Sequence, residues 1–251
     1  MRRLSEQSLP AFDFDNKLSL NTKRVSVILC EDVSGSMASK YTLMNEQLKK
    51  FFSIKATDAV ICGRTDLYVI KFSSTVSEPE KSTLLNYNFN PFTRDDFNGQ
   101  THLWSALLKA VELAETIISN NDYTPWILLY TDGFPNNEVD SVKDDAIAKL
   151  QSLEKEDKLV LFILGIGYNN DNDKVNKAIL ESISKRGKKL VFYASDLEID
   201  VCRFFDALVK TLTVTVPRLD TFAIQKGGAV IYNIDDIVDT FFDDLKNQGL
   251  S

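Results

Sequence analysis

The sequence has few of the residues that build disulfide frameworks, zinc sites or histidine-based catalytic centres. Its 251 residues include three cysteines and a single histidine. Cys30, Cys62 and Cys202 are odd in number and show no CxxC spacing, which argues against a disulfide framework and against a zinc site. Cys30 lies in a strongly apolar run, so we expect it to be a small buried hydrophobic residue.

Long apolar runs and an excess of positive charge are also missing. No stretch approaches the ~20 apolar residues of a membrane span. The first 21 residues contain two arginines but no apolar segment typical of a secretory signal. The formal net charge is −7, whereas nucleic acids and anionic membranes are held mainly by Lys and Arg. We therefore expect a cytoplasmic protein with neither nucleic acid nor membrane as its partner.

The shorter apolar runs that the sequence does contain alternate with amphipathic segments. Runs at residues 25–30 (VSVILC), 126–130 (WILLY) and 159–166 (LVLFILGI) are typical of strands in a parallel sheet covered on both faces. Weaker strand candidates are residues 67–72 and 190–193. Apolar residues spaced three and four apart predict helices at 37–51, 103–118, 146–153, 175–183 and 201–212. This alternation predicts an α/β fold, a doubly wound and mostly parallel sheet flanked by helices.

Three regions are predicted along the chain. They are an N-terminal extension over 1–22, a main domain over 23–212 and a C-terminal extension over 213–251. The C-terminal extension reads as a short strand at 214–216, a hairpin around the glycine pair at 227 and 228, and an acidic helix over 235–246. The apolar side of that helix is expected either to dock on the main domain or to face a partner.

Oxygen-bearing side chains follow the first predicted strand, directly before a helix. In the segment EDVSGSM (31–37), Asp32, Ser34 and Ser36 place three such side chains around one spot. Thr101 precedes a later helix, and Asp132 follows the strand WILLY. In a doubly wound sheet these loops meet at the edge where the strands end. Mg²⁺ prefers about six oxygen ligands and readily keeps some of them as water, so the pattern indicates a site for Mg²⁺ or Mn²⁺.

Simpler interpretations of the same residues remain open at this point. Ser34 or Ser36 could cap the following helix by accepting hydrogen bonds from its first N–H groups. The segment TDG at 131–133 could be only a turn. Trp104 and Trp126 are expected to belong to the core rather than to a stacking surface.

Taken together, the three loops resemble the metal-ion-dependent adhesion site (MIDAS) of von Willebrand factor A (vWA) domains. The motif DxSxS, the threonine and the aspartate of that site fall on Asp32, Ser34, Ser36, Thr101 and Asp132. The resemblance covers residues 24–212. It implies that the serines and the threonine contact the cation, that the aspartates often act through water, and that a Glu or Asp of a partner protein completes the coordination.

The resemblance implies a non-enzymatic, metal-dependent protein–protein interaction module. Because it has no recognisable signal or membrane segment, the chain resembles stand-alone intracellular bacterial members of the family, such as those associated with tellurite resistance and stress response. Two positions differ from the usual pattern. Glu31 stands where an apolar or small residue is common, and the loop before Thr101 reads NGQT in place of a double glycine. Glu31 either faces away from the metal or adds negative charge beside it.

The main alternative is a Mg²⁺-dependent phosphohydrolase or phosphotransferase on a similar sheet. Such enzymes place an aspartate where Asp32 stands, but the haloacid-dehalogenase pattern requires a second aspartate where this chain has Ser34. No Walker A or GxSxG segment is present, and His102 has no evident triad partner. A structural subunit with a vestigial site is the third possibility.

Overall fold

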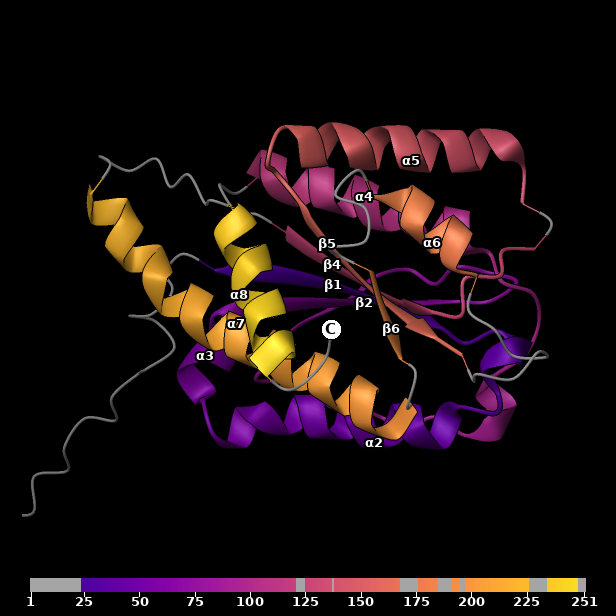
Figure 1. Cartoon of the computed structure of the whole chain (residues 1–251), viewed down its shortest axis with the longest axis horizontal. Helices are drawn as coiled ribbons and strands as arrows, with labels where there is room; N and C mark the ends of the chain where they lie inside the picture. Colours follow the sequence, from indigo (N-terminus) through magenta and orange to yellow (C-terminus); the bar gives the residue numbers. More distant parts are fainter. Residues whose placement is uncertain are drawn as a thin grey trace, which may run out of the picture.

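A six-stranded sheet forms the centre of the molecule (Figure 1). The computed structural model describes residues 24–120, 125–136, 138–167, 176–184, 191–194, 197–225 and 234–247. The strand order is β3-β2-β1-β4-β5-β6. The strands are β1 (Val25–Asp32), β2 (Thr65–Phe72), β3 (Glu80–Thr83), β4 (Pro125–Thr131), β5 (Val160–Ile166) and β6 (Val191–Ala194).

Parallel pairing dominates among the described strands, where only the edge strand β3 runs antiparallel to its neighbour β2. Every residue of β1, β4 and β5 is buried, as their nearly continuous apolar sequences predict. The predicted doubly wound, mostly parallel α/β fold is therefore confirmed. Because β1 lies between β2 and β4, the loop that follows β1 emerges at the middle of the sheet edge.

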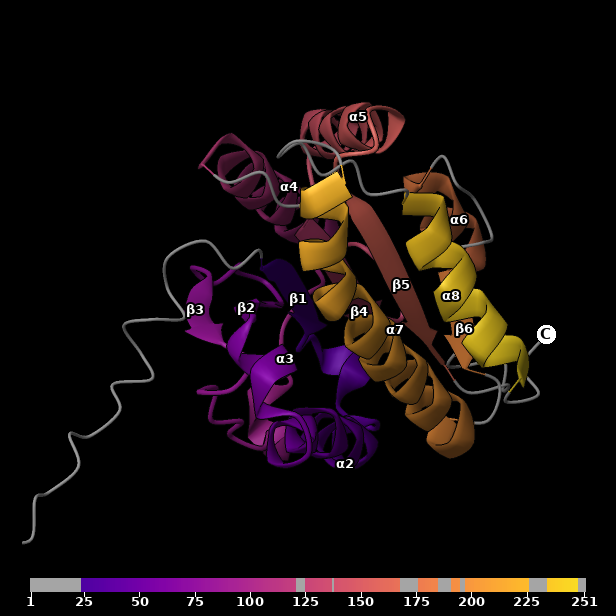
Figure 2. The ribbon, with the colours of Figure 1, turned by 90° about the vertical axis from the view of Figure 1, so that its left-hand side faces the viewer.

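Helices cover both faces of the sheet (Figure 2). One face is covered by α2 (Tyr41–Phe52), α3 (Ala59–Gly63), α7 (Leu197–Gln225) and α8 (Ile234–Asn247). The other is covered by α4 (Leu103–Asn120), α5 (Asp140–Lys155) and α6 (Lys177–Ile183). Alternate residues of β1 supply the two apolar layers, with Val27 and Leu29 in the first and Ile28 and Cys30 in the second. Both tryptophans are in the core, as predicted.

The predicted strand at residues 214–216 is wrong, because this segment belongs to the 29-residue helix α7. Leu208, Leu212 and Val216 recur at four-residue intervals and are almost completely buried. Packing of this stripe against the sheet outweighs the preference of the Thr-Val-Thr-Val run for strands. The hairpin predicted around residues 227 and 228 lies outside the described residues. The division into three regions stays a prediction.

The predicted C-terminal helix is present as α8, and it docks on the main domain. Phe241 is 1% exposed and packs against Phe162 of β5 and Phe204 of α7, with ring centroids 4.7 and 5.3 Å away. The apolar side of α8 thus joins the core layer that covers the sheet. In the described part of the chain, no helix combines the length and the apolar character needed to cross a membrane.

Candidate metal site

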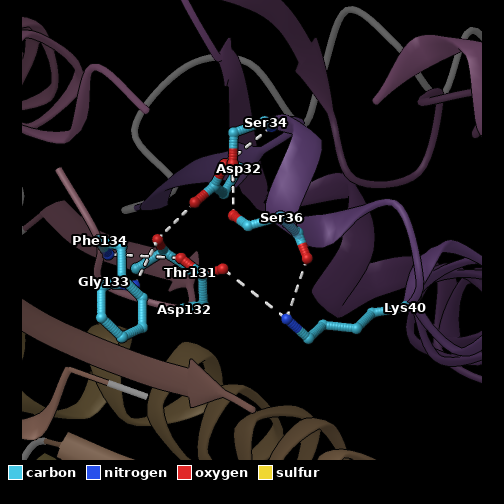
Figure 3. A network of polar contacts seen from close by, with 8 residues as sticks. All are labelled: Asp32, Ser34, Ser36, Lys40, Thr131, Asp132, Gly133 and Phe134. Atoms are coloured by element: carbon cyan, nitrogen blue, oxygen red, sulfur yellow. Dashed lines mark hydrogen bonds and ion pairs between the residues drawn. The ribbon is translucent and has the colours of Figure 1, made fainter. Parts of the chain in front are cut away.

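The five predicted ligand residues lie in loops at the carboxyl edge of the sheet. Asp32 ends β1, Ser34 and Ser36 belong to the turn after it, Asp132 follows β4, and Thr101 precedes α4. Four of the five are almost completely buried, and Ser36 is exposed. Figure 3 shows that the side chains of Asp32, Ser34, Ser36 and Asp132 point toward a common region.

Backbone hydrogen bonds hold the three loops against one another. Gly35 N donates to Gly99 O at 3.2 Å, and Asn98 N donates to Val33 O at 3.1 Å. These two bonds join the turn after β1 to the loop that carries Thr101. Asn136 N donates to Thr101 O at 3.0 Å, which joins that loop to the segment after Asp132. The structure therefore brings Thr101 to the same edge as the other four residues.

Asp32 is fixed by hydrogen bonds to both of its oxygens. Ser34 N donates to Oδ1 at 2.9 Å, and Thr131 Oγ1 donates to Oδ2 at 2.5 Å. The Ser34 and Ser36 hydroxyls are 3.1 Å apart. Burial and, to a smaller extent, the nearby carboxylate of Asp132 raise the pKa of Asp32 to about 7, although the hydrogen bonds from Ser34 and Thr131 lower it. A cation among these oxygens would favour the ionised form of Asp32.

A buried lysine completes the cluster. Lys40, at the N-cap of α2, has a side chain that is 0% exposed. Its ammonium donates to Ser36 O at 3.1 Å and lies 3.7 Å from Asp132 Oδ2. The other oxygen of Asp132 accepts a hydrogen bond from Phe134 N at 3.3 Å. Sequence reasoning missed Lys40, because a lysine at the start of a helix is usually solvated.

Glu31 is buried on the opposite face of β1 from Asp32. Successive side chains of a strand alternate between faces, which places Glu31 with Leu29 on the side of α2 and α7. Neither carboxylate oxygen of Glu31 has a hydrogen-bond partner among the described residues. Burial raises the pKa of Glu31 to about 7, with Lys71 lowering it and Glu80 raising it. Of the two expectations for Glu31, the structure therefore supports the one in which it faces away from the candidate ligands.

Among the described residues, the cluster is rich in hydroxyls and contains two carboxylates, those of Asp32 and Asp132. In the part of the chain that the structure describes, no three His, Cys, Asp or Glu side chains gather in a way that could hold a metal ion. A cation at this edge would therefore need Ser and Thr hydroxyls to complete its ligands. Oxygen ligands of this kind suit Mg²⁺ and Mn²⁺.

Comparison with known proteins identifies the fold. No protein-family model and no curated protein sequence matches the chain. The pilus adhesin SpaC from Lactobacillus rhamnosus GG, in its open conformation, aligns with 77% of this chain and 30% of its own, at a TM-score of 0.56 and 15% identity. Proximal thread matrix protein 1 from the mussel byssus aligns with 76% of this chain and 48% of its own, at 0.51 and 20% identity.

A structure described as von Willebrand factor type A, from Catenulispora acidiphila, aligns with 76% of this chain and 43% of its own, at a TM-score of 0.47 and 16% identity. The chain spans less than half the length of each of these three proteins. Likeness at such identities concerns the fold alone, and the two structures with TM-scores above 0.5 support the α/β fold described above.

Proposed function

We propose that this chain, which has the vWA-type fold, is a metal-dependent protein-binding module and not an enzyme. In this proposal Ser34, Ser36 and Thr101 hold Mg²⁺ or Mn²⁺ by their hydroxyls, with Asp32 and Asp132 close by. A glutamate or aspartate of a partner protein would complete the coordination. The observation that carries the proposal is the burial of Asp32 beside Asp132, with the hydroxyls of Ser34 and Ser36 next to them.

The chemistry of the cluster supports a cation. Two adjacent carboxylates repel each other when both are ionised, and a divalent ion between them would remove that repulsion. Because neutral hydroxyls fill much of the coordination shell, the ion would keep enough positive charge to attract another carboxylate. Phe134, 42% exposed and directly after Gly133, gives a partner an apolar contact beside the site.

Calorimetric titration with Mg²⁺ and Mn²⁺ tests the metal site. We expect one site in the wild type, and loss of binding in Asp32→Ala and Thr101→Ala. Asp32→Asn is a milder version, because the amide keeps the shape of the carboxylate and can still accept hydrogen bonds. Asp95→Asn is the matched control, since Asp95 is exposed on the 3₁₀-helix before the Thr101 loop. Binding that survives in Asp32→Asn and Asp32→Ala would refute the site.

Two further measurements separate a binding module from an enzyme. The metal-loaded protein is expected to leave a generic phosphate monoester unhydrolysed, and measurable metal-dependent hydrolysis that Asp32→Asn abolishes would favour the phosphohydrolase alternative. The metal-loaded protein is also expected to capture a partner that a chelator releases. The cytoplasmic location and the resemblance to intracellular bacterial members stay predictions.

A further inference from the structure

We infer that Lys40 adjusts two affinities of the candidate site. It lowers the affinity of the site for the cation, and it raises the affinity of the occupied site for an anionic partner group. The inference rests on the proposed function, because it concerns the same five ligand residues. It adds a residue that the ligand pattern does not contain. Figure 3 shows the ammonium of Lys40 pointing at Asp132 and at the turn that carries Ser36.

The position of Lys40 is not explained by the stability of α2, because a lysine there does not favour the helix. It is the N-cap of α2 and makes no side-chain cap. A positive charge near a helix N-terminus opposes the helix dipole, and long charged side chains are rarely buried without an ionic partner. The side chain is nevertheless 0% exposed, and its ammonium contacts Ser36 O and Asp132 Oδ2. These contacts direct the charge of Lys40 into the cluster.

The charges of the cluster show what the ammonium does. Among the described residues, Asp32 and Asp132 in their ionised forms sum with Lys40 to a charge of minus one. A divalent cation changes this to plus one. Without Lys40 the occupied cluster would be neutral. Lys40 therefore repels the incoming metal, and it leaves the loaded site with an excess positive charge that attracts a carboxylate.

Neutralising Lys40 should therefore change two affinities in opposite directions. Lys40→Met keeps an unbranched apolar stem and removes the ammonium, together with its charge and its hydrogen bond to Ser36 O. The matched control is Lys49→Met, which removes the same charge from an exposed position nine residues further along the chain, in α2. A lysine that acted only through packing would weaken both affinities or neither, so the opposite signs identify the charge effect.

The test uses Mn²⁺ as the metal and acetate as the carboxylate. Mn²⁺ affinity is measured by the electron paramagnetic resonance signal of the free ion. Acetate binding is measured by the fall in water-proton relaxation as the carboxylate displaces water from bound Mn²⁺. For Lys40→Met we expect Mn²⁺ binding roughly tenfold tighter and half-saturation at roughly tenfold more acetate, because one unit charge is removed a few ångströms from the ion. Lys49→Met should match the wild type in both.

The outcomes separate this inference from the proposed function. If the wild type binds Mn²⁺ and Lys40→Met shows unchanged or weaker Mn²⁺ binding, the inference is overturned while the metal site stands. Unchanged acetate affinity would overturn it equally. If the wild type binds no Mn²⁺, the proposed function fails and the inference fails with it. If Lys40→Met does not fold, Lys40→Gln replaces it, because its amide keeps a donor for Ser36 O. The same tighter Mn²⁺ binding and weaker acetate binding are expected of it.

Discussion

Thr131 on β4 donates a hydrogen bond of 2.5 Å to Asp32 Oδ2 on β1, and so links the two central strands at the edge where the candidate ligands gather. The same hydroxyl accepts a hydrogen bond from Gly133 N at 3.0 Å. Thr131 therefore orients both the carboxylate that ends β1 and the turn that carries Asp132. In the sequence motif TDG at 131–133, the threonine stabilises the structure of the site and the aspartate is a candidate ligand.

Replacing Thr131 by valine should destabilise the protein while preserving the volume of the side chain. The change leaves Asp32 Oδ2 and Gly133 N without this partner in a buried place, which costs about 1–3 kcal/mol in the free energy of unfolding. Thr131→Ser keeps the hydroxyl and should lose less. Urea unfolding of the three proteins checks this, and equal stability of the Val and Ser variants would contradict it.

The buried Glu31 should make stability depend on pH. Its pKa in the folded protein is about 7, above the ordinary value of 4.5, so the folded state binds the proton more tightly than the unfolded state. The resulting stabilisation is complete below pH 4.5 and is lost as the pH rises through about 7. The shift limits the effect to about 3 kcal/mol.

Glu31→Gln tests this dependence, because the amide has no carboxyl to titrate. The free energy of unfolding of the variant minus that of the wild type should increase as the pH is raised from about 5 to about 8. Asp66→Asn on β2 serves as a control, since Asp66 is partly exposed and paired with Arg24. Chemical unfolding at both pH values measures the difference. A gap between Glu31→Gln and the wild type that does not change with pH would show that Glu31 stays in one protonation state.

Gly133 is expected to tolerate no larger residue. Its φ of +77° is a conformation that side-chain-bearing residues rarely adopt, and an added Cβ would lie 2.9 Å from Cγ and Cδ2 of Leu180 on α6. Gly133→Ala should therefore lose about 1–3 kcal/mol of stability. Adding Leu180→Ala would relieve the clash but not the backbone strain. Thermal unfolding should show that Leu180→Ala costs less stability in the Gly133→Ala background than in the wild type.

The docking of α8 should contribute strongly to stability. Phe241 is almost completely buried between β5 and α7, so Phe241→Ala should cost about 3–5 kcal/mol. Phe242, the next residue, is only partly buried and serves as a control whose replacement by alanine should cost clearly less. Denaturant unfolding compares the two variants. Equal losses would mean that α8 is held by something other than the Phe241 contact.

The sequence predicted the strands that are buried on both faces and missed the edge strand β3. Strands β1, β4 and β5 have nearly unbroken apolar sequences, so their pattern is visible without the structure. The edge strand β3 reads EKST and has no apolar residue to reveal it. Residues 214–216 have strand-forming side chains, and only packing on the sheet makes them helical.

In the site, the sequence predicts what neighbouring residues determine and misses what depends on residues far away in the chain. The motif at residues 31–37 could be recognised because its oxygens are close in the chain, and Thr101 and Asp132 could be added because strand order determines which loops meet. The roles of Lys40 and Thr131 depend on partners 92 and 99 residues away (Asp132 for Lys40, Asp32 for Thr131). Nothing in their local sequence indicates those partners.

The backbone bonds that join the three loops of the site bear on the kinetics of metal uptake. Gly35, Asn98 and Asn136 donate these bonds to backbone carbonyls of the protein, so the contacts between the loops need no bond to the ion. Ordering a flexible loop costs conformational entropy, and here little of that cost is left for the binding step. Metal association should therefore be limited by loss of water from the ion, and amide hydrogen exchange in these loops should change little on loading.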